Sequence, residues 1–180
     1  MPSFNSAART AILAAAQNRA TEGFMNRYGM RLGASRFVAG ESLSECVQVI
    51  RQLNQQGFKC NATELGEAVA TEADAQGAVG DYEELLQRLA SENLNANVAI
   101  KLTLLGLAID EELAERNMAH LLEVARSLGM FMRIDMEESV RVDPTLRLYR
   151  RLRERGFDNV GAVLQSYLYR AVADLDSLLP

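Results

Sequence analysis

The chain has 180 residues, of which 48% are hydrophobic and 24% are charged, the balance of a globular domain with a substantial core. Its net charge of -5 argues against a partner held through nucleic-acid phosphates. No apolar run approaches the roughly 20 residues that a membrane helix needs, and the N-terminus lacks a signal-peptide pattern. Two cysteines, Cys46 and Cys60, and the single His120 do not make a zinc spacing. We therefore expect a cytoplasmic protein without a metal.

The first part of the chain predicts a helical extension over residues 1–34, because Ser6–Tyr28 is rich in strong helix formers and contains no proline. From Ser35 the pattern changes to short strands alternating with long helices, and we assign residues 35–180 to one domain. Its first unit is a strand at Ser35–Glu41, followed by a helix from Leu43 that stops near Gly57.

The same alternation continues to the end of the chain. It predicts strands within Phe58–Glu67, Asn97–Leu107, Met130–Glu137 and Asn159–Leu168, and helices at Thr71–Ala90 with a break near Gly77–Gly80, Ile109–Gly129, Pro144–Arg155 and from Ala171. Strict βα alternation means a parallel sheet, either doubly wound or closed into a barrel. No G-x-G-x-x-G motif follows a predicted strand, so the dinucleotide-binding fingerprint that would favour a doubly wound Rossmann fold is absent. About five units of about 30 residues each predict an incomplete barrel, because an eightfold barrel takes about 250 residues.

Three strand candidates each carry one polar residue near the carboxyl end, namely Lys101, Asp135 and Gln165. The carboxyl ends of parallel strands meet at one edge, so we expect these residues to line a shared pocket. A structural interpretation stays open for each. Lys101 could pair with a carboxylate, Asp135 with Arg133 or Lys101, and Gln165 could satisfy backbone groups.

Several motifs, in the right order, resemble the proline dehydrogenase family, both its small bacterial form and the corresponding domain of the bifunctional proline-utilisation protein. The motifs are FVAGES at Phe37–Ser42, AIKLTLLGL at Ala99–Leu107, RIDMEES at Arg133–Ser139, VDPTLRLYRRLRERG at Val142–Gly156 and NVGAVLQSYLYR at Asn159–Arg170.

This resemblance implies a distorted (β/α)8 barrel with FAD at the carboxyl ends of its strands. It implies oxidation of L-proline to Δ1-pyrroline-5-carboxylate, the first step of proline catabolism to glutamate, by hydride transfer to the flavin. A quinone would take the electrons, which implies peripheral contact with the inner membrane. Lys101 would pair with the substrate carboxylate and Asp135 would be the catalytic group beside the flavin. Met136, Val163 and Gln165 would contact the flavin.

The resemblance covers only the N-terminal part of the family pattern. The family's later motifs, including a Tyr-x-x-Arg-Arg clamp for proline, have no counterpart in this chain. Tyr149, Arg150 and Arg151 look similar, but they lie on a helix between two strands, where we expect a solvated helix face. An open barrel would expose the edge strand around Val163. We therefore expect either self-association or a missing C-terminal segment as the partner.

Two other functions fit the same residues. Lys101 at a strand end also suits a Schiff-base lyase or aldolase, in which desolvation lowers the lysine pKa and the amine attacks a carbonyl. The third interpretation is a non-catalytic partial barrel that is stable only with a second chain.

Overall fold

The structure is a computed structural model that describes residues 18, 33, 38–66 and 68–179. Two units can be distinguished, Met1–Cys46 and Val47–Pro180. The expected helical extension over residues 1–34 falls almost entirely outside the described residues and stays a prediction.

The described end of the first unit caps a helix and forms no strand. Residues 38–41 are loop and bend, and residues 35–37 of the predicted strand lie outside the described part. The Ser42 hydroxyl accepts from the Glu45 N–H at 3.3 Å, and the Glu45 carboxylate accepts from the Glu41 N–H at 2.8 Å. The Ser42 bond satisfies one donor that the helix start leaves open, and the Glu45 bond holds the residue before the cap against the first turn. At residues 38–41 the strand prediction is therefore wrong, because the backbone serves the helix cap.

The second unit alternates strands and helices along the chain, as predicted. Helix α3 begins in the first unit and continues into the second. The bounds are α3 Leu43–Gln55, β1 Cys60–Ala62, α4 Glu72–Ser91, β2 Ala96–Ile100, α5 Glu111–Ser127, β3 Met132–Ile134, the 3-10 turn η2 Ser139–Arg141, α6 Val142–Glu154, β4 Val160–Ala162 and α7 Ala171–Asp176.

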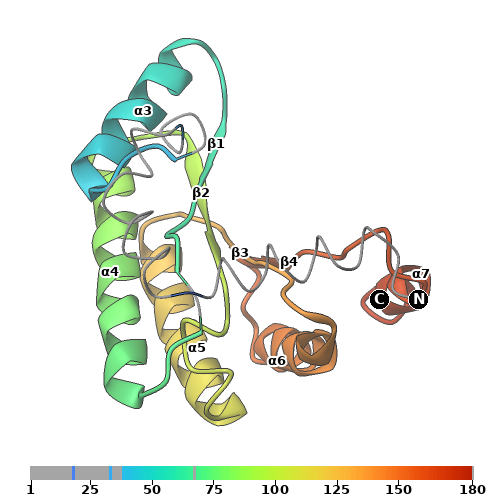
Figure 1. The fold of residues 1–180 in the computed structure, drawn as a ribbon. Coiled ribbons are helices and arrows are strands. Elements are labelled where there is room, and N and C mark those ends of the chain that lie inside the picture. The colour runs from blue at the N-terminus through green and yellow to red at the C-terminus, as the bar shows by residue number, and fades with distance from the viewer. Residues whose placement is uncertain (1–17, 19–32, 34–37, 67, 180) are drawn as a thin grey trace. The chain divides into compact units, whose positions relative to one another are not determined.

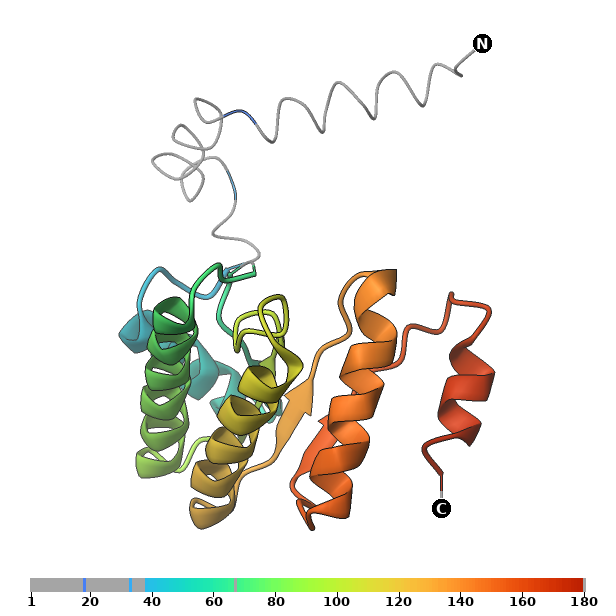
Figure 2. The ribbon, with the colours of Figure 1, turned by 90° about the horizontal axis from the view of Figure 1, so that it is seen from below.

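The sheet is parallel throughout, in the order β1-β2-β3-β4. Right-handed crossovers place every helix on the same face when the strand order does not reverse. Helices α4, α5 and α6 accordingly lie side by side along one face of the sheet (Figures 1 and 2). A doubly wound sheet needs a reversal of strand order, and the described strands contain none. The predicted parallel α/β architecture is confirmed, with four strands among the described residues against the five predicted.

The core lies between the sheet and this layer of helices. Val98, Ile100, Met132 and Ile134 alternate along β2 and β3, and each is fully buried. On the helix side, α5 contributes the largest set of buried residues: Leu113, Ala114, Asn117, Met118, Ala119, Leu121, Leu122 and Ala125. Helix α5 is therefore the central element of the layer.

Helix α4 runs without the break predicted near its glycines. Nothing lies within 4 Å of a Cβ built at Gly77 or Gly80, so both face open space. A glycine inside a helix costs about 0.5–1 kcal/mol relative to alanine. Burial of residues such as Tyr82, Leu86 and Leu89 offsets that cost, because a fully buried large side chain is worth about 1.5–3 kcal/mol.

The strands are shorter than their apolar runs predicted. The run that starts at Asn97 leaves the strand after Ile100 and continues as turns through Ile109. The turn residues Leu102, Leu104, Leu105 and Leu107 are nevertheless buried, because this loop packs over the end of the core. Because these buried loop residues are as hydrophobic as strand residues, a prediction from hydrophobicity alone makes the strand too long.

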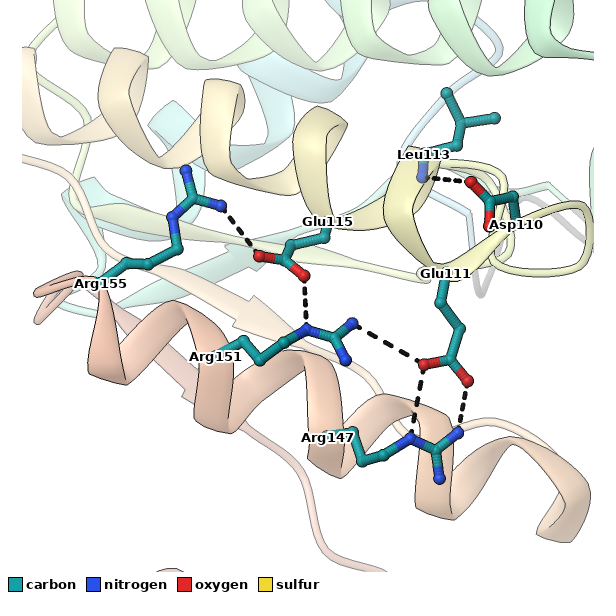
Figure 3. A network of polar contacts seen from close by, with 7 residues as sticks. All are labelled: Asp110, Glu111, Leu113, Glu115, Arg147, Arg151 and Arg155. Atoms are coloured by element: carbon teal, nitrogen blue, oxygen red, sulfur yellow. Dashed lines mark hydrogen bonds and ion pairs between the residues drawn. The ribbon is translucent and has the colours of Figure 1, made fainter.

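An ion-pair network joins α5 to α6 (Figure 3). Glu111 pairs with Arg147 and lies 3.7 Å from Arg151, while Glu115 accepts from Arg151 at 2.5 Å and from Arg155 at 3.0 Å. Arg151, which superficially resembles the proline clamp, thus belongs to the outer helix layer. The predicted helix-face role of Arg151 is confirmed.

Polar contacts also attach α7 to α6. Arg150 donates to the Ser177 hydroxyl at 2.6 Å, and Arg170 bonds to Asp143 at 2.5 Å and to Asp174 at 2.7 Å. The Arg170 hydrogen bond lowers the pKa of the exposed Asp143 carboxyl. In Figure 2, α7 lies beyond α6 at the end of the row of helices.

The central position of α5 gives a test of the core. Truncating Leu122, which is fully buried, to alanine should lower the free energy of unfolding by about 2–5 kcal/mol through lost burial and a cavity. Glu123→Ala, the exposed neighbour, should change it by less than about 0.5 kcal/mol. Urea unfolding measures both, and equal losses would place the core elsewhere.

The α5–α6 network should stabilise the fold only modestly. Glu115→Gln removes the charge that faces two arginines, and we expect a loss of about 0.5–1 kcal/mol at low salt. In about 1 M salt most of the difference from the unchanged chain should disappear, because screening is strong there. A loss that is independent of salt would mean that Glu115 acts through packing.

Candidate functional site

The carboxyl edge of the sheet holds three of the predicted site residues at one level. Register pairs Ile100 with Ile134 and Ile134 with the last residue of β4. Beyond the strands, the Asp135 N–H donates to the Ile100 carbonyl and the Val163 N–H donates to the Ile134 carbonyl, each at 2.9 Å. Lys101, Asp135 and Val163 are therefore level on three neighbouring strand ends.

The two charged side chains at this edge are half-buried, and each has its own partner. The Lys101 ammonium donates to the Gly66 carbonyl at 3.1 Å, in the loop after β1. The Asp135 carboxylate lies 3.7 Å from Arg133 Nε and keeps 30% of its side chain exposed. Of the structural alternatives, the Asp135–Arg133 pair is present and a Lys101–carboxylate pair is absent among the described residues.

The other two predicted residues lie in loops. Met136 directly follows Asp135 and is half-buried. Gln165 stands two positions beyond Val163, where its carbonyl accepts from the Leu168 N–H at 3.1 Å and begins a turn. The predicted strand therefore ends before Gln165, and Gln165 does not share the level of Lys101 and Asp135.

Two residues that were not among the predicted site residues, Thr103 and Glu137, connect the loops at this edge. The Thr103 N–H donates to Glu137 Oε1 at 3.1 Å, and the Thr103 hydroxyl donates to Glu137 Oε2 at 2.5 Å. The Val69 N–H donates to the Thr103 carbonyl at 3.3 Å. Thr103 and Glu137 lie beyond the ends of β2 and β3, where strand alternation no longer holds, so no local pattern in the sequence marks their contact.

A buried tyrosine completes this edge. The Tyr82 phenol, 1% exposed, lies 3.5 Å from the Thr63 hydroxyl and accepts from the Glu64 N–H at 3.3 Å. Burial raises the pKa of Tyr82, hydrogen bonds with Thr63 and Glu64 oppose that rise, and the carboxylates of Glu64 and Asp135 add to it. Burial, followed by the charge of Asp81, likewise raises the pKa of Glu64.

The face of the sheet away from the helices carries several polar side chains. Alternation places Asn97, Arg133, Lys101 and Asp135 opposite the buried aliphatic side chains of the same strands. Asn97 Oδ1 and Arg133 Nε are buried without a hydrogen-bond partner among the described residues. Buried polar atoms of this kind need a partner, so this face suits a polar ligand or further protein.

A shallow depression of about 340 Å³ lies at the opposite edge, where β3 and β4 begin. It is lined by Arg126, Gly129, Met130, Phe131, Asp158 and Asn159. Arg126 is already engaged, because it donates to the Gly156 carbonyl at 2.7 Å and lies 3.7 Å from Asp158. The half-buried charges Lys101 and Asp135 lie at the carboxyl edge, and we place the candidate site there.

The fold and this edge define a class of protein, a parallel α/β sheet with an uninterrupted strand order and charged side chains at the strand ends. A family model described as proline dehydrogenase matches residues 46–180. The chain belongs to the proline dehydrogenase family.

Individual relatives agree with this assignment. The chain is 36% identical to proline dehydrogenase 1 of Bacillus subtilis strain 168 over 167 residues, which cover 93% of this chain and 55% of that protein. It is 35% identical to proline dehydrogenase of Deinococcus radiodurans over 179 residues, covering 96% of this chain and 57% of that protein. The chain thus spans about half the length of these curated relatives.

Solved structures show the same fold. Proline utilization A from Bdellovibrio bacteriovorus, inactivated by N-propargylglycine, superposes with a TM-score of 0.69 at 23% identity, covering 78% of this chain and 18% of that one. Among the residues that the structure describes, no helix is long and apolar enough to cross a membrane.

Tyr82 gives this edge a measurable pH dependence. Its pKa is higher in the folded than in the unfolded chain, so the folded state holds the phenolic proton more tightly. The stabilisation is complete below the unfolded value of about 10 and is lost as pH rises through the folded value. Urea unfolding between neutral and strongly alkaline pH should show a loss that Tyr82→Phe lacks. Identical pH profiles for the two chains would contradict the burial of this phenol.

Proposed function

We propose that this chain forms the N-terminal part of an FAD-dependent proline dehydrogenase that oxidises L-proline to Δ1-pyrroline-5-carboxylate. The observation that supports it most is the placement of Lys101 and Asp135 at one level of the carboxyl edge, in a chain of this family. In this proposal the sheet continues beyond β4 into a (β/α)8 barrel, because its uninterrupted strand order is the order that a barrel uses.

The polar face of the sheet has groups that fit a flavin. Asn97 Oδ1 and Arg133 Nε offer an acceptor and a donor that have no hydrogen-bond partner among the described residues, although Arg133 Nε lies 3.7 Å from Asp135. Met136 and Val163 would supply apolar and backbone contacts, and the Gln165 amide would bond to the polar edge of the isoalloxazine. When bound, the flavin would accept a hydride from the ring carbon next to the proline nitrogen that does not carry the carboxylate, while the nitrogen loses a proton.

The chain's own charges would bind and orient the substrate. Lys101 is half-buried and held by Gly66, so it offers a fixed cation to the proline carboxylate. A cation in a partly dry site binds a carboxylate more strongly than one in water. Asp135, beside the flavin, would place a negative charge near the reacting centre, where Arg133 limits its movement. These roles are proposals for the complete protein.

The remaining expectations concern partners and location. A quinone would take the electrons from the reduced flavin, and the protein would be cytoplasmic with peripheral contact at the inner membrane. Strand β4 is an edge strand: it pairs with β3 on one side, and on its other side it pairs with no strand among the described residues. The strands that follow in a complete barrel would pair there, whether from the same chain, a second chain or a second copy.

A Schiff-base lyase remains the second candidate, because Lys101 Nζ bonds to a neutral carbonyl and pairs with no carboxylate among the described residues. The chain offers a sharp test, since Lys59 and Lys101 are its only lysines. The chain should be prepared alone and co-expressed with the C-terminal half of the Bacillus subtilis relative. Yellow protein that L-proline bleaches without oxygen supports the proposal. Colourless protein with borohydride trapping of a carbonyl substrate on Lys101 supports the lyase, and a flavin-free, independently folded monomer supports neither enzyme.

Lys101→Met should weaken the binding of a proline analogue by about tenfold to a hundredfold, because one charge-assisted bond is worth about 1.5–3 kcal/mol. Flavin binding should stay nearly unchanged. Lys59→Met, at an exposed position, is the matched control and should alter neither. Titration of flavin absorbance with the analogue measures both affinities. Loss of flavin in Lys101→Met would show that Lys101 holds the cofactor instead.

A further inference from the structure

The three loops beyond β1, β2 and β3 are joined through a single residue. Thr103 gives its N–H and its hydroxyl to Glu137 in the loop after β3, and its carbonyl accepts from Val69 in the loop after β1. Thr103 is buried, with 2% of its surface exposed. Its N–H, its carbonyl and its hydroxyl each form a hydrogen bond to a neighbouring loop. A side-chain substitution at Thr103 removes the hydroxyl bond to Glu137 directly, and it leaves the two backbone bonds without that support.

Glu137 differs from the other carboxylate of its loop. Both oxygens of Glu137 accept from Thr103, so this carboxylate is tied to the neighbouring loop. The Asp135 carboxylate has only the contact with Arg133 at 3.7 Å and remains 30% exposed. One carboxylate of the pair is thus free to meet a ligand, while the other fixes the loop that carries it.

These bonds bracket the candidate site. On one side of Lys101 and Asp135, the Asp135 N–H donates to the Ile100 carbonyl at 2.9 Å. On the other side, Glu137 accepts from Thr103. Each site residue is therefore held between two connections to the neighbouring strand or loop, which limits the change in separation of the two charges.

The loop after β1 is included in the same frame. Lys101 Nζ donates to the Gly66 carbonyl, and three positions further along that loop Val69 bonds to Thr103. A Cβ on Gly66 would come within 2.8 Å of Leu104, so this loop lies close against the loop after β2. The acceptor that orients Lys101 is thus itself held through Thr103.

We propose that Glu137 and Thr103 are positioning residues, which hold Lys101 and Asp135 in a fixed relative position through the loops beyond β1, β2 and β3. The consequence for catalysis rests on the proposed function, but the mechanical claim does not. Neither residue needs to touch substrate or flavin for this role. Their bonds preorganise two charged groups whose separation would otherwise vary with loop motion.

The two lysines of the chain allow the mechanical claim to be measured without cofactor. The 180-residue chain is acetylated briefly under native conditions, and mass spectrometry gives the rate at Lys101 relative to exposed Lys59. Thr103→Val removes the hydroxyl and Glu137→Gln removes the charge, and in each the Lys101 rate should rise by up to about tenfold. Two controls should leave the ratio of the Lys101 rate to the Lys59 rate unchanged. Thr103→Ser keeps the hydroxyl, and Glu138→Gln changes an exposed neighbour.

Hydrogen exchange distinguishes local loosening from global destabilisation. In Thr103→Val and Glu137→Gln the amides of Thr103 and Val69 should exchange faster, while that of Ile134 in β3 keeps its protection. If Glu137→Gln is too unstable to purify, Glu137→Asp should show the same direction, because it shortens the side chain by one methylene. The proposal would be overturned if the Thr103 amide lost its protection while the Lys101 acetylation rate stayed the same. It would also be overturned if the exchange rate at Ile134 rose as much as the rates in the loops, because that means global destabilisation.

The flavin-bound enzyme provides the functional arm. Thr103→Val should raise KM for proline more than it lowers kcat, and Thr103→Ser should restore the original values. Altered acetylation together with an absence of flavin would leave the positioning claim supported and the proposed function contradicted. Normal flavin reduction with unaltered acetylation would support the proposed function and contradict the positioning claim.

Discussion

The parallel register between β2 and β3 is the constraint on which the rest of the structure depends. It pairs Ile100 with Ile134 and extends one step further, where the Asp135 N–H reaches the Ile100 carbonyl. A slip by one residue would turn every side chain of a strand to the other face. Burial of the large aliphatic residues against α5 resists such a slip, so the hydrophobic core also sets the position of Lys101 beside Asp135.

Stability and chemistry are divided between the two faces of the sheet. The helix face carries the apolar core and, outside it, ion pairs such as Glu115–Arg151 that are individually weak at an exposed surface. The opposite face carries polar groups, among them Asn97 Oδ1 and Arg133 Nε, that lack hydrogen-bond partners among the described residues. The chain spans about half the length of its curated relatives.

Much of this arrangement could be predicted from the sequence because its signals are local. Helix α5 follows from apolar periodicity, the Asp110 cap and Gly129 in the left-handed region at φ 67, and Lys101 and Asp135 stand out as charges within apolar runs. The predicted strands were too long, because buried leucines in a loop have the same hydrophobic pattern as residues of a buried strand. The bond between Thr103 and Glu137 joins residues 34 positions apart and depends on the register of two strands, which no local pattern encodes.

A cross-linking experiment tests most directly whether Lys101 and Asp135 are level neighbours at the carboxyl edge. Adjacent parallel strands lie about 4.8 Å apart, within the Cα separation of about 4.4–6.8 Å that a disulfide spans. In a background with both native cysteines replaced by serine, Lys101→Cys with Asp135→Cys should oxidise readily to a disulfide, with loss of free thiols seen by mass after alkylation. Lys101→Cys with Met136→Cys, one position out of register, should not. Ready closure of the second pair, or failure of the first in a folded chain, would contradict the register and the site built on it.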